Sequence, residues 1–293
     1  SNPVFFGIVG NATKDDKGVA YSLTEEFTSV YRLHSLLPET FNLLAERDGK
    51  LIRAIPMPEI RKEKSAALLR SGVRLVDVMY SFGVQKPGQL VLGNYPKFLQ
   101  ELNTPVYSIG KTPIINIHVD MATVDILRDR ERGVPRYNEF RRQVGLRPIK
   151  SYRELVGLDS NPYPQTALNA AQKAEAEILA GKLAKIYGSN EIDVLVDPVS
   201  KRMEKKVVDN VEEIDLLVGT HAEGVRPDNF GFGETQFQIF ILMASRRLKS
   251  DRFFTDDFRP EIYTEFGIDY LRKSSMLSVL RRHYPQLAPA LSG

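Results

Sequence analysis

Tyr31 and His34 stand three residues apart in SLTEEFTSVYRLHSLLPE at 22–39, a stretch with the pattern of an amphipathic helix. We expect both side chains on the apolar face of one helix that runs to Pro38. Three apolar residues recur with them at spacings of three and four: Phe27, Val30 and Leu37. A histidine in such a position is usually structural, hydrogen-bonded to a backbone carbonyl. Because imidazole is also a common metal ligand, the alternative is that His34 binds a metal or cofactor.

The composition restricts which metal site the chain could build. It has no cysteine, which excludes disulfides, cysteine-type zinc sites, iron–sulfur clusters and thiolate nucleophiles. Any metal must therefore rest on histidine or oxygen ligands. No two of the four histidines have the spacing of a helical metal pair: His34, His118, His221 and His283. A cofactor that needs one protein ligand fits best, and we expect no function of the other three histidines.

Haem is a cofactor of this kind. The porphyrin supplies four equatorial ligands, so one histidine is enough on the proximal side of the iron. A tyrosine one helical turn from that histidine, at roughly 5 Å along the axis, could approach the same haem edge and be oxidised to a radical. On the residues of this stretch alone, a structural His34 and a haem-binding His34 both stay open.

Size and charge bound the class of protein. A chain of 293 residues, 42% of them hydrophobic, can form one large domain or two small ones. Its 40 basic and 37 acidic residues are interspersed, so we expect no nucleic-acid partner. The apolar run at 237–244 is too short to span a bilayer, and the first residues carry no basic-plus-apolar leader. These features favour a soluble, cytoplasmic protein and leave association with a membrane surface open.

The hydrophobic periodicity predicts a mainly α fold with few strands. The segment PIINIHVD at 113–120 is ambiguous between strand and helix. The segment 161–208 differs in character, being alanine-rich and then lysine-rich, and we interpret it as an insertion. EIDVLVD at 191–197 and EIDLLVG at 213–219 are similar, which two acid-capped helices would explain. The predicted helices lie at 65–84, after Pro96, at 120–134, between Pro135 and Gly145, at 166–188, within 231–254 and within 271–287.

Four blocks of the sequence together resemble one family. The stretch at 22–39 is similar to the proximal helix of the fatty-acid α-dioxygenases, which share Tyr-x-x-His followed by Leu-Leu-Pro. These enzymes belong to the superfamily of animal-type haem peroxidases and cyclooxygenases. Three further blocks resemble the family in the same order, at 128–146, 211–219 and 233–255. The resemblance covers most of the chain and implies a helical, haem-peroxidase-like domain that binds haem b.

The resemblance implies roles for particular residues. His34 matches the proximal ligand of the haem iron, and Tyr31 matches the tyrosine whose radical takes a hydrogen atom from the fatty acid. Asn138 matches the asparagine that hydrogen-bonds the proximal histidine and so sets its tautomer. Arg141 matches an arginine that pairs with a haem propionate. Without the family, the arginine-rich segment around Arg141 would be interpreted as a solvated helix face.

The same resemblance assigns the substrate's head group. Arg247 matches the arginine that anchors the fatty-acid carboxylate, and its neighbour Arg246 would take that role after a one-residue shift of the alignment. Anchoring a flexible chain at its head fixes which carbon reaches the radical. Without the family, arginines at a helix end would serve only to favour the helix dipole. Most residues of 237–244 are expected to be core, although the run could line an acyl channel.

The implied function is a haem-dependent fatty-acid α-dioxygenase, with a fatty acid and O₂ as partners and a 2-hydroperoxy fatty acid as product. The alternatives are a haem peroxidase, a fatty-acid dioxygenase of other regiochemistry, or an inert, haem-free helical fragment. In the family, the distal histidine lies well before the proximal helix. We therefore expect residues 1–293 to be the C-terminal, proximal part of the catalytic domain, with an insertion at 161–208 and a missing N-terminal half. Whether this chain binds haem alone stays open.

Overall fold

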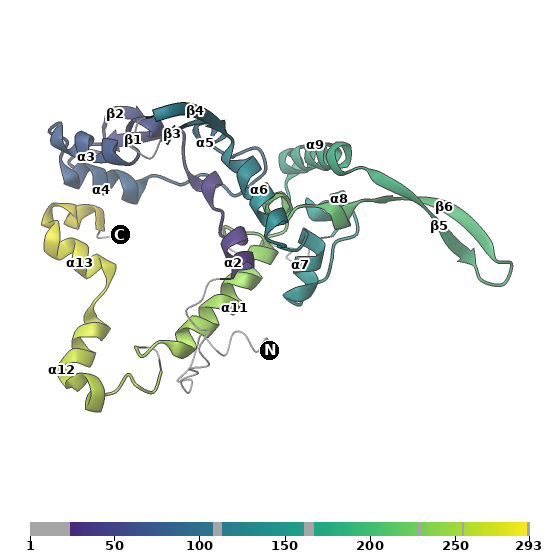
Figure 1. Cartoon of the computed structure of the whole chain (residues 1–293). Helices are drawn as coiled ribbons and strands as arrows, with labels where there is room; N and C mark the ends of the chain where they lie inside the picture. The colour runs from purple at the N-terminus through teal and green to yellow at the C-terminus, as the bar shows by residue number, and fades with distance from the viewer. Residues whose placement is uncertain (1–23, 108–112, 161–166, 228–229, 254, 292–293) are drawn as a thin grey trace.

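The computed structural model describes residues 24–107, 113–160, 167–227, 230–253 and 255–291 (Figure 1). Within these residues the chain is mainly helical, and its strands form separate two-stranded antiparallel hairpins rather than one sheet. The predicted fold class is therefore confirmed. No helix of the described part is long and apolar enough to cross a bilayer.

Twelve α-helices and six strands make up the described part of the fold. The α-helices are α2 (Glu25–Val30), α3 (Glu63–Arg70), α4 (Leu75–Val84), α5 (Lys97–Gln100), α6 (Met121–Glu131), α7 (Tyr137–Gln143), α8 (Tyr152–Leu155), α9 (Ala170–Tyr187), α10 (Leu216–Ala222), α11 (Glu234–Ser250), α12 (Pro260–Lys273) and α13 (Met276–His283). The strands pair as β1 (Thr40–Leu44) with β2 (Leu51–Pro56), β3 (Leu102–Tyr107) with β4 (Pro113–Val119), and β5 (Ser189–Asp197) with β6 (Arg202–Asp209). Short 3-10 turns include η1 (His34–Leu36), η4 (Val211–Glu213) and η5 (Pro285–Leu291).

The first helix is shorter than the sequence pattern predicts. The hydroxyl of Thr24 caps α2, but the helix ends at Val30, and the chain reaches Pro38 through the 3-10 turn η1. The prediction of one helix to Pro38 is wrong for a tertiary reason. The carbonyls of η1 accept hydrogen bonds from a loop distant in sequence: Leu36 O from Gly88 N at 2.9 Å, and Ser35 O from Asn94 Nδ2 at 3.0 Å.

Other helix predictions divide between confirmed and wrong. The helices after Pro96, at 120–134, after Pro135, at 166–188, within 231–254 and within 271–287 are confirmed by α5, α6, α7, α9, α11 and α13, and α12 was not predicted. The helix at 65–84 is broken at Gly72, whose φ of 88° suits a residue without Cβ. PIINIHVD forms β4, and EIDVLVD forms β5 instead of the expected helix, because each pairs along its length with a second strand.

One main core joins helices from distant parts of the chain. Its largest fully buried side chains include Tyr137 and Phe140 of α7, with Ile214 just before α10. Helix α9 adds Ala176, Ala180 and Leu183 to this core, so the helix within the predicted insertion packs onto the domain. The β5–β6 hairpin that follows is largely exposed and projects from the body as a long arm (Figure 1). The bounds of an insertion at 161–208 stay a prediction.

Away from the core, large apolar side chains lie open to water. Phe266 of α12 is 80% exposed, Ile186 of α9 is 74% exposed and Phe82 of α4 is 70% exposed. Helices α12 and α13 extend away from the body, and η5 returns to contact α4 (Figure 1). Dispersed apolar residues are normal, but exposed aromatic rings on several helices indicate surfaces suited to a partner.

Close packing of α10 on α7 generates the first test. A Cβ on Gly219 would lie 2.2 Å from ring carbons of Tyr137, which is fully buried. We expect Gly219→Ala to lower the free energy of unfolding by about 1–3 kcal/mol, because the crowded core cannot accept the extra methyl group. Gly181→Ala is the matched control, since Gly181 lies in α9 with open space around it. It should raise the free energy of unfolding by about 0.5–1 kcal/mol. Urea unfolding of both variants measures these changes. An unchanged free energy of unfolding in Gly219→Ala would contradict the close packing of Gly219 on Tyr137.

Candidate active site

Tyr31 lies at the C-cap of α2 with its hydroxyl available. Its ring stacks on Phe27 at 5.1 Å between centroids, and 48% of the residue is exposed. The hydroxyl makes no hydrogen bond within the described residues. Tyr31 and Phe240 of α11 line the same small hollow, and Gln236 Nε2 ties α11 to the Val30 carbonyl at 2.9 Å. Tyr31 is therefore fixed at its base and accessible at its phenol.

His34 begins the turn η1 and points one ring nitrogen at two partners. Its Nδ1 lies 3.0 Å from the Tyr95 hydroxyl and 3.2 Å from Oδ2 of Asp125. The hydroxyl in turn lies 3.4 Å from that same oxygen. The Asp125 side chain, from α6, is 2% exposed and that of His34 is 29% exposed. Nε2 of His34 has no hydrogen-bond partner in the described part of the chain.

This geometry selects one tautomer of His34. An ionised carboxylate can only accept hydrogen bonds, so an unprotonated Nδ1 would face it lone pair to lone pair. With its proton on Nδ1, the ring faces the Tyr95 oxygen and the Asp125 carboxylate, and Nε2 then carries the lone pair that a metal ligand needs. The residues at this position therefore fit a single-ligand metal cofactor.

The sequence reasoning missed both partners of His34. Tyr95 precedes α5 in a loop, and Asp125 lies in the helix that the arginine-rich pattern suggested is solvated. Asp125 and Asp129 lie one helical turn apart, but only the structure shows that both are buried and therefore need partners. No local pattern links Asp125 to His34, which is 91 residues away in the chain.

Asn138 makes its hydrogen bonds within the main core. It is fully buried on α7, where its Nδ2 donates to Ile149 O and to Glu212 Oε1, both at 3.0 Å, and its Oδ1 accepts from Ile149 N at 2.9 Å. These bonds use both amide hydrogens and one lone pair of Oδ1, and none of them joins Asn138 to His34. Tyr95 and Asp125 face Nδ1 of His34 here, and the role of Asn138 beside the histidine stays a prediction.

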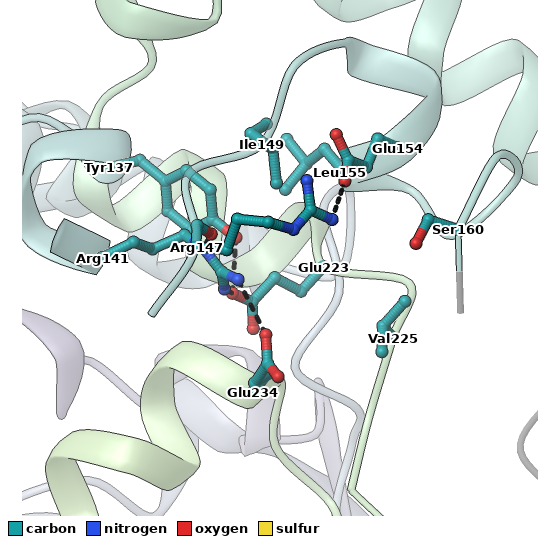
Figure 2. A pocket seen from close by; sticks show the side chains of 10 residues that line it. All are labelled: Tyr137, Arg141, Arg147, Ile149, Glu154, Leu155, Ser160, Glu223, Val225 and Glu234. Carbon is teal, nitrogen blue, oxygen red and sulfur yellow. Dashed lines mark hydrogen bonds and ion pairs between the residues drawn. The ribbon is translucent and has the colours of Figure 1, made fainter. Parts of the chain in front are cut away.

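Arg141 likewise has protein partners instead of an open position. Figure 2 shows its guanidinium between Glu223 and Glu234, in the wall of a pocket of about 350 Å³. It donates to Glu234 Oε2 at 2.7 Å, Thr235 Oγ1 at 2.9 Å, Glu223 Oε1 at 3.2 Å and the Arg147 carbonyl at 2.7 Å. The side chain is 7% exposed, and its pairing with a haem propionate stays a prediction.

The surroundings of Arg141 are a buried charged network. Burial raises the pKa of Glu223, and the positive charge of Arg141 opposes that rise. Burial and the neighbouring Glu223 raise the pKa of Tyr137 well above its ordinary value, so Tyr137 stays a phenol and donates to Glu223. The network joins α7, the end of α10 and the start of α11. Its chemistry is that of a structural ion pair rather than of an open site.

Arg247 and Arg246 differ in environment. Arg247 is partly buried and makes no hydrogen bond or ion pair within the described residues, whereas Arg246 is exposed. Arg247 follows Phe240 by seven positions in the helix, so both project from nearly the same side of α11, roughly 10 Å apart along the axis. Arg246 is turned away from that side by about 100°. Arg247 therefore shares the side of α11 that Phe240 presents to Tyr31.

The remaining histidines lie apart from this arrangement. His118 on β4 and His283 in α13 are exposed. His221 is buried in α10, where its Nδ1 lies 2.9 Å from the Leu217 carbonyl, and burial lowers its pKa to about 4, so the ring is neutral. In the described part of the chain, no three histidine, aspartate or glutamate side chains group into a metal site.

Replacing Arg141 tests whether its role is structural. Arg141→Leu leaves Glu223 buried without its cation, and we expect the free energy of unfolding to fall by about 3–5 kcal/mol. The adjacent Arg142 is the matched control, because its ion pairs with Glu139 and Glu212 are exposed. Arg142→Leu should cost less than about 1 kcal/mol. Denaturant unfolding without added haem measures both, and equal small losses would contradict the buried network.

The sequence of this chain matches a known family of proteins. The family model of the animal haem peroxidases matches residues 5–291. The chain is 36% identical to α-dioxygenase 2 of Arabidopsis thaliana and 38% identical to the α-dioxygenase PIOX of Oryza sativa. Each alignment covers 97% of this chain and 40% of the relative. The chain thus spans about two-fifths of the length of these relatives.

Solved structures agree with the sequence matches. The crystal structure of the Oryza sativa fatty acid α-dioxygenase has a TM-score of 0.71 at 36% identity, over 96% of this chain and 40% of that chain. A tyrosine-to-phenylalanine variant of that enzyme with palmitic acid gives a TM-score of 0.70. Peroxidase A from Dictyostelium discoideum shares the fold, with a TM-score of 0.61 at 18% identity over 93% of this chain and 42% of that chain. The described helices, the family match and the α-dioxygenase relatives together show that the chain belongs to the animal haem peroxidase family.

Proposed function

We propose that this chain forms the proximal part of a haem-dependent fatty-acid α-dioxygenase. The observation that carries the proposal is the pair Tyr31 and His34, an accessible phenol three residues before an imidazole whose Nε2 is free. It occurs in a chain that is similar over 97% of its length to proteins named α-dioxygenases. Members of this family use haem, and the single free imidazole suits a cofactor that needs one protein ligand.

His34 would hold the iron of haem b through Nε2. When bound there, haem would supply the oxidising power, and Tyr31 would lose one electron and one proton to become a radical. The hydroxyl of Tyr31 supports that role, because no acceptor among the described residues binds it. The stacking of Tyr31 on Phe27 keeps the ring in place without covering its oxygen.

The radical on Tyr31 would then work on the carbon next to the carboxylate. Its oxygen takes a hydrogen atom from that α-carbon, which re-forms the Tyr31 O–H bond and leaves a carbon radical. O₂ adds to the carbon radical and gives a peroxyl radical. The peroxyl takes the hydrogen atom back from Tyr31, which releases the 2-hydroperoxy fatty acid and regenerates the tyrosyl radical.

Arg247 would bind the carboxylate of the fatty acid. A guanidinium binds a carboxylate with two parallel hydrogen bonds, and Arg247 has no protein partner among the described residues. Its position on the side of α11 that carries Phe240 supports a substrate head held near Tyr31. Holding the head there brings the α-carbon, rather than carbons further along the chain, to the phenol oxygen.

The remainder of the catalytic site would come from sequence outside this chain. The relatives are longer, and this chain covers 40% of them. Exposed aromatic residues such as Phe82 and Phe266 offer apolar surface for such a partner segment. We infer that residues 1–293 are the C-terminal part of one catalytic domain with an insertion at 161–208, and a cytoplasmic location stays a prediction.

Three alternatives remain beside this proposal. The likeness to peroxidase A extends to the fold, and a peroxidase or a dioxygenase of different regiochemistry would also use His34. Analysis of the product separates these, because an α-dioxygenase gives the 2-hydroperoxy acid. A haem-free fragment is the third reading, and it predicts no histidine-ligated absorption spectrum when the chain is mixed with haem.

Removing the phenol tests the radical role. In the haem-loaded full-length gene product, Tyr31→Phe should lower O₂ consumption with palmitic acid to the background of the haem-free protein, because phenylalanine has no O–H bond to exchange. The absorption spectrum of the haem should stay that of the wild type. Tyr270→Phe is the control, since Tyr270 is exposed to a similar extent, at 49%. Undiminished O₂ consumption by Tyr31→Phe would overturn the radical role.

The two neighbouring arginines provide a matched test of substrate anchoring. We expect Arg247→Leu to raise the KM for palmitic acid about 10- to 100-fold, as the loss of a charge-assisted hydrogen bond of about 1.5–3 kcal/mol implies. Arg246→Leu should leave KM nearly unchanged, because that side chain is exposed on another side of α11. Steady-state O₂ uptake measures both, and the reverse order would assign the carboxylate to Arg246.

A further inference from the structure

We propose that Asp125 positions His34 and strengthens its Nε2 as a donor to iron, with Tyr95 moderating that effect. The inference rests on the proposed haem function of His34 and adds the residues that set its electronic character. Asp125 and Tyr95 act through His34, so both are positioning residues.

The contact between Asp125 and His34 has the features of a built pair. Asp125 is 1% exposed and extends from α6 to the turn η1. Its Oδ2 lies 3.2 Å from Nδ1 of His34, and its Oδ1 lies 3.4 Å from Nε of Arg32. Oδ2 therefore contacts His34 and Oδ1 contacts Arg32, and the two contacts together fix the orientation of the carboxylate.

Tyr95 shares both members of the pair. Its hydroxyl lies 3.0 Å from Nδ1 of His34 and 3.4 Å from Oδ2 of Asp125. A tyrosine phenol is protonated at neutral pH, so the Tyr95 hydroxyl can donate as well as accept. With one proton on Nδ1, the phenol donates to Asp125, and the Nδ1–H is divided between the carboxylate and the phenol oxygen.

A carboxylate beside the non-ligating nitrogen of a histidine changes the reduction potential of the metal that the histidine binds. Accepting the Nδ1 proton increases electron density on Nε2, which favours the more highly charged ferric state over the ferrous state. Two contacts weaken that effect here, because Arg32 shares the carboxylate's charge and Tyr95 shares the Nδ1 proton. Removing the carboxylate should therefore raise the ferric–ferrous midpoint potential of the iron, and removing the phenol should lower it.

The test uses the full-length gene product loaded with haem, and measures the ferric–ferrous midpoint potential together with the iron–histidine stretching band of the ferrous protein. Asp125→Asn keeps an acceptor oxygen and removes the charge. We expect the ratio of ferric to ferrous protein to fall about tenfold at a given potential, a rise of about 59 mV for one electron. The stretching band should move to lower frequency.

A neighbouring carboxylate gives the matched control. Asp129 is also buried and lies one turn further along α6, but its hydrogen bond comes from Ser29 and not from the histidine. Asp129→Asn should leave the potential and the stretching band as in the wild type. Circular dichroism would check that each variant is folded.

Tyr95→Phe supplies the second arm and covers the case in which Asp125→Asn does not fold. It leaves Asp125 as the one acceptor for Nδ1–H, so the midpoint potential should fall and the stretching band should rise. Unchanged values in Asp125→Asn, or no fall in Tyr95→Phe, would overturn the positioning role while His34 still ligates the haem. If His34→Ala keeps a histidine-ligated spectrum, the ligand assignment itself fails, which is a separate result.

Discussion

The buried carboxylate of Asp125 holds the turn that carries the candidate chemistry. The helical run stops at Val30, and from Tyr31 to Pro38 the backbone is a short irregular turn with few internal hydrogen bonds. Asp125 fixes this turn from α6 through His34 and Arg32, while the loop at Gly88–Asn94 takes the free carbonyls of η1. A turn with such external supports can set a ring orientation that a regular helix would not allow.

A second buried charge organises the other side of the core. Glu223 receives Arg141 from α7, together with Tyr137 and Thr235, so one carboxylate joins three helices. Taking such a carboxylate out of water is costly, and the cost is offset because Oε1 accepts from Tyr137, Arg141 and Thr235 while Oε2 accepts from the Thr235 backbone N–H. The network fixes how α7, α10 and α11 meet, and α11 in turn carries both Phe240 and Arg247.

The exposed apolar surface is consistent with a chain that covers part of a longer relative. The relatives named α-dioxygenases extend well past the matched region, and this chain leaves aromatic residues of α4 and α12 open to water. Its main core nevertheless closes around Tyr137 and Ile214, both 0% exposed. The described part of the chain is therefore internally supported around this core, and its exposed aromatic residues lie on α4 and α12.

The sequence by itself determined the helical class, most of the helices after residue 85 and the family, and it predicts Tyr31 and His34 as the functional pair. Those features depend on local periodicity, on caps and breakers such as Asp120 and Pro135, or on blocks that keep their order along the chain. Only the tertiary structure decided which side chains serve His34 and Arg141. Partner choice among several buried polar residues depends on how helices dock, so no local pattern contains the protein partners of Asn138 and Arg141. The strands β1, β4 and β5 were decided in the same way, since a strand is stable only through the hydrogen bonds of a second strand that no local pattern contains.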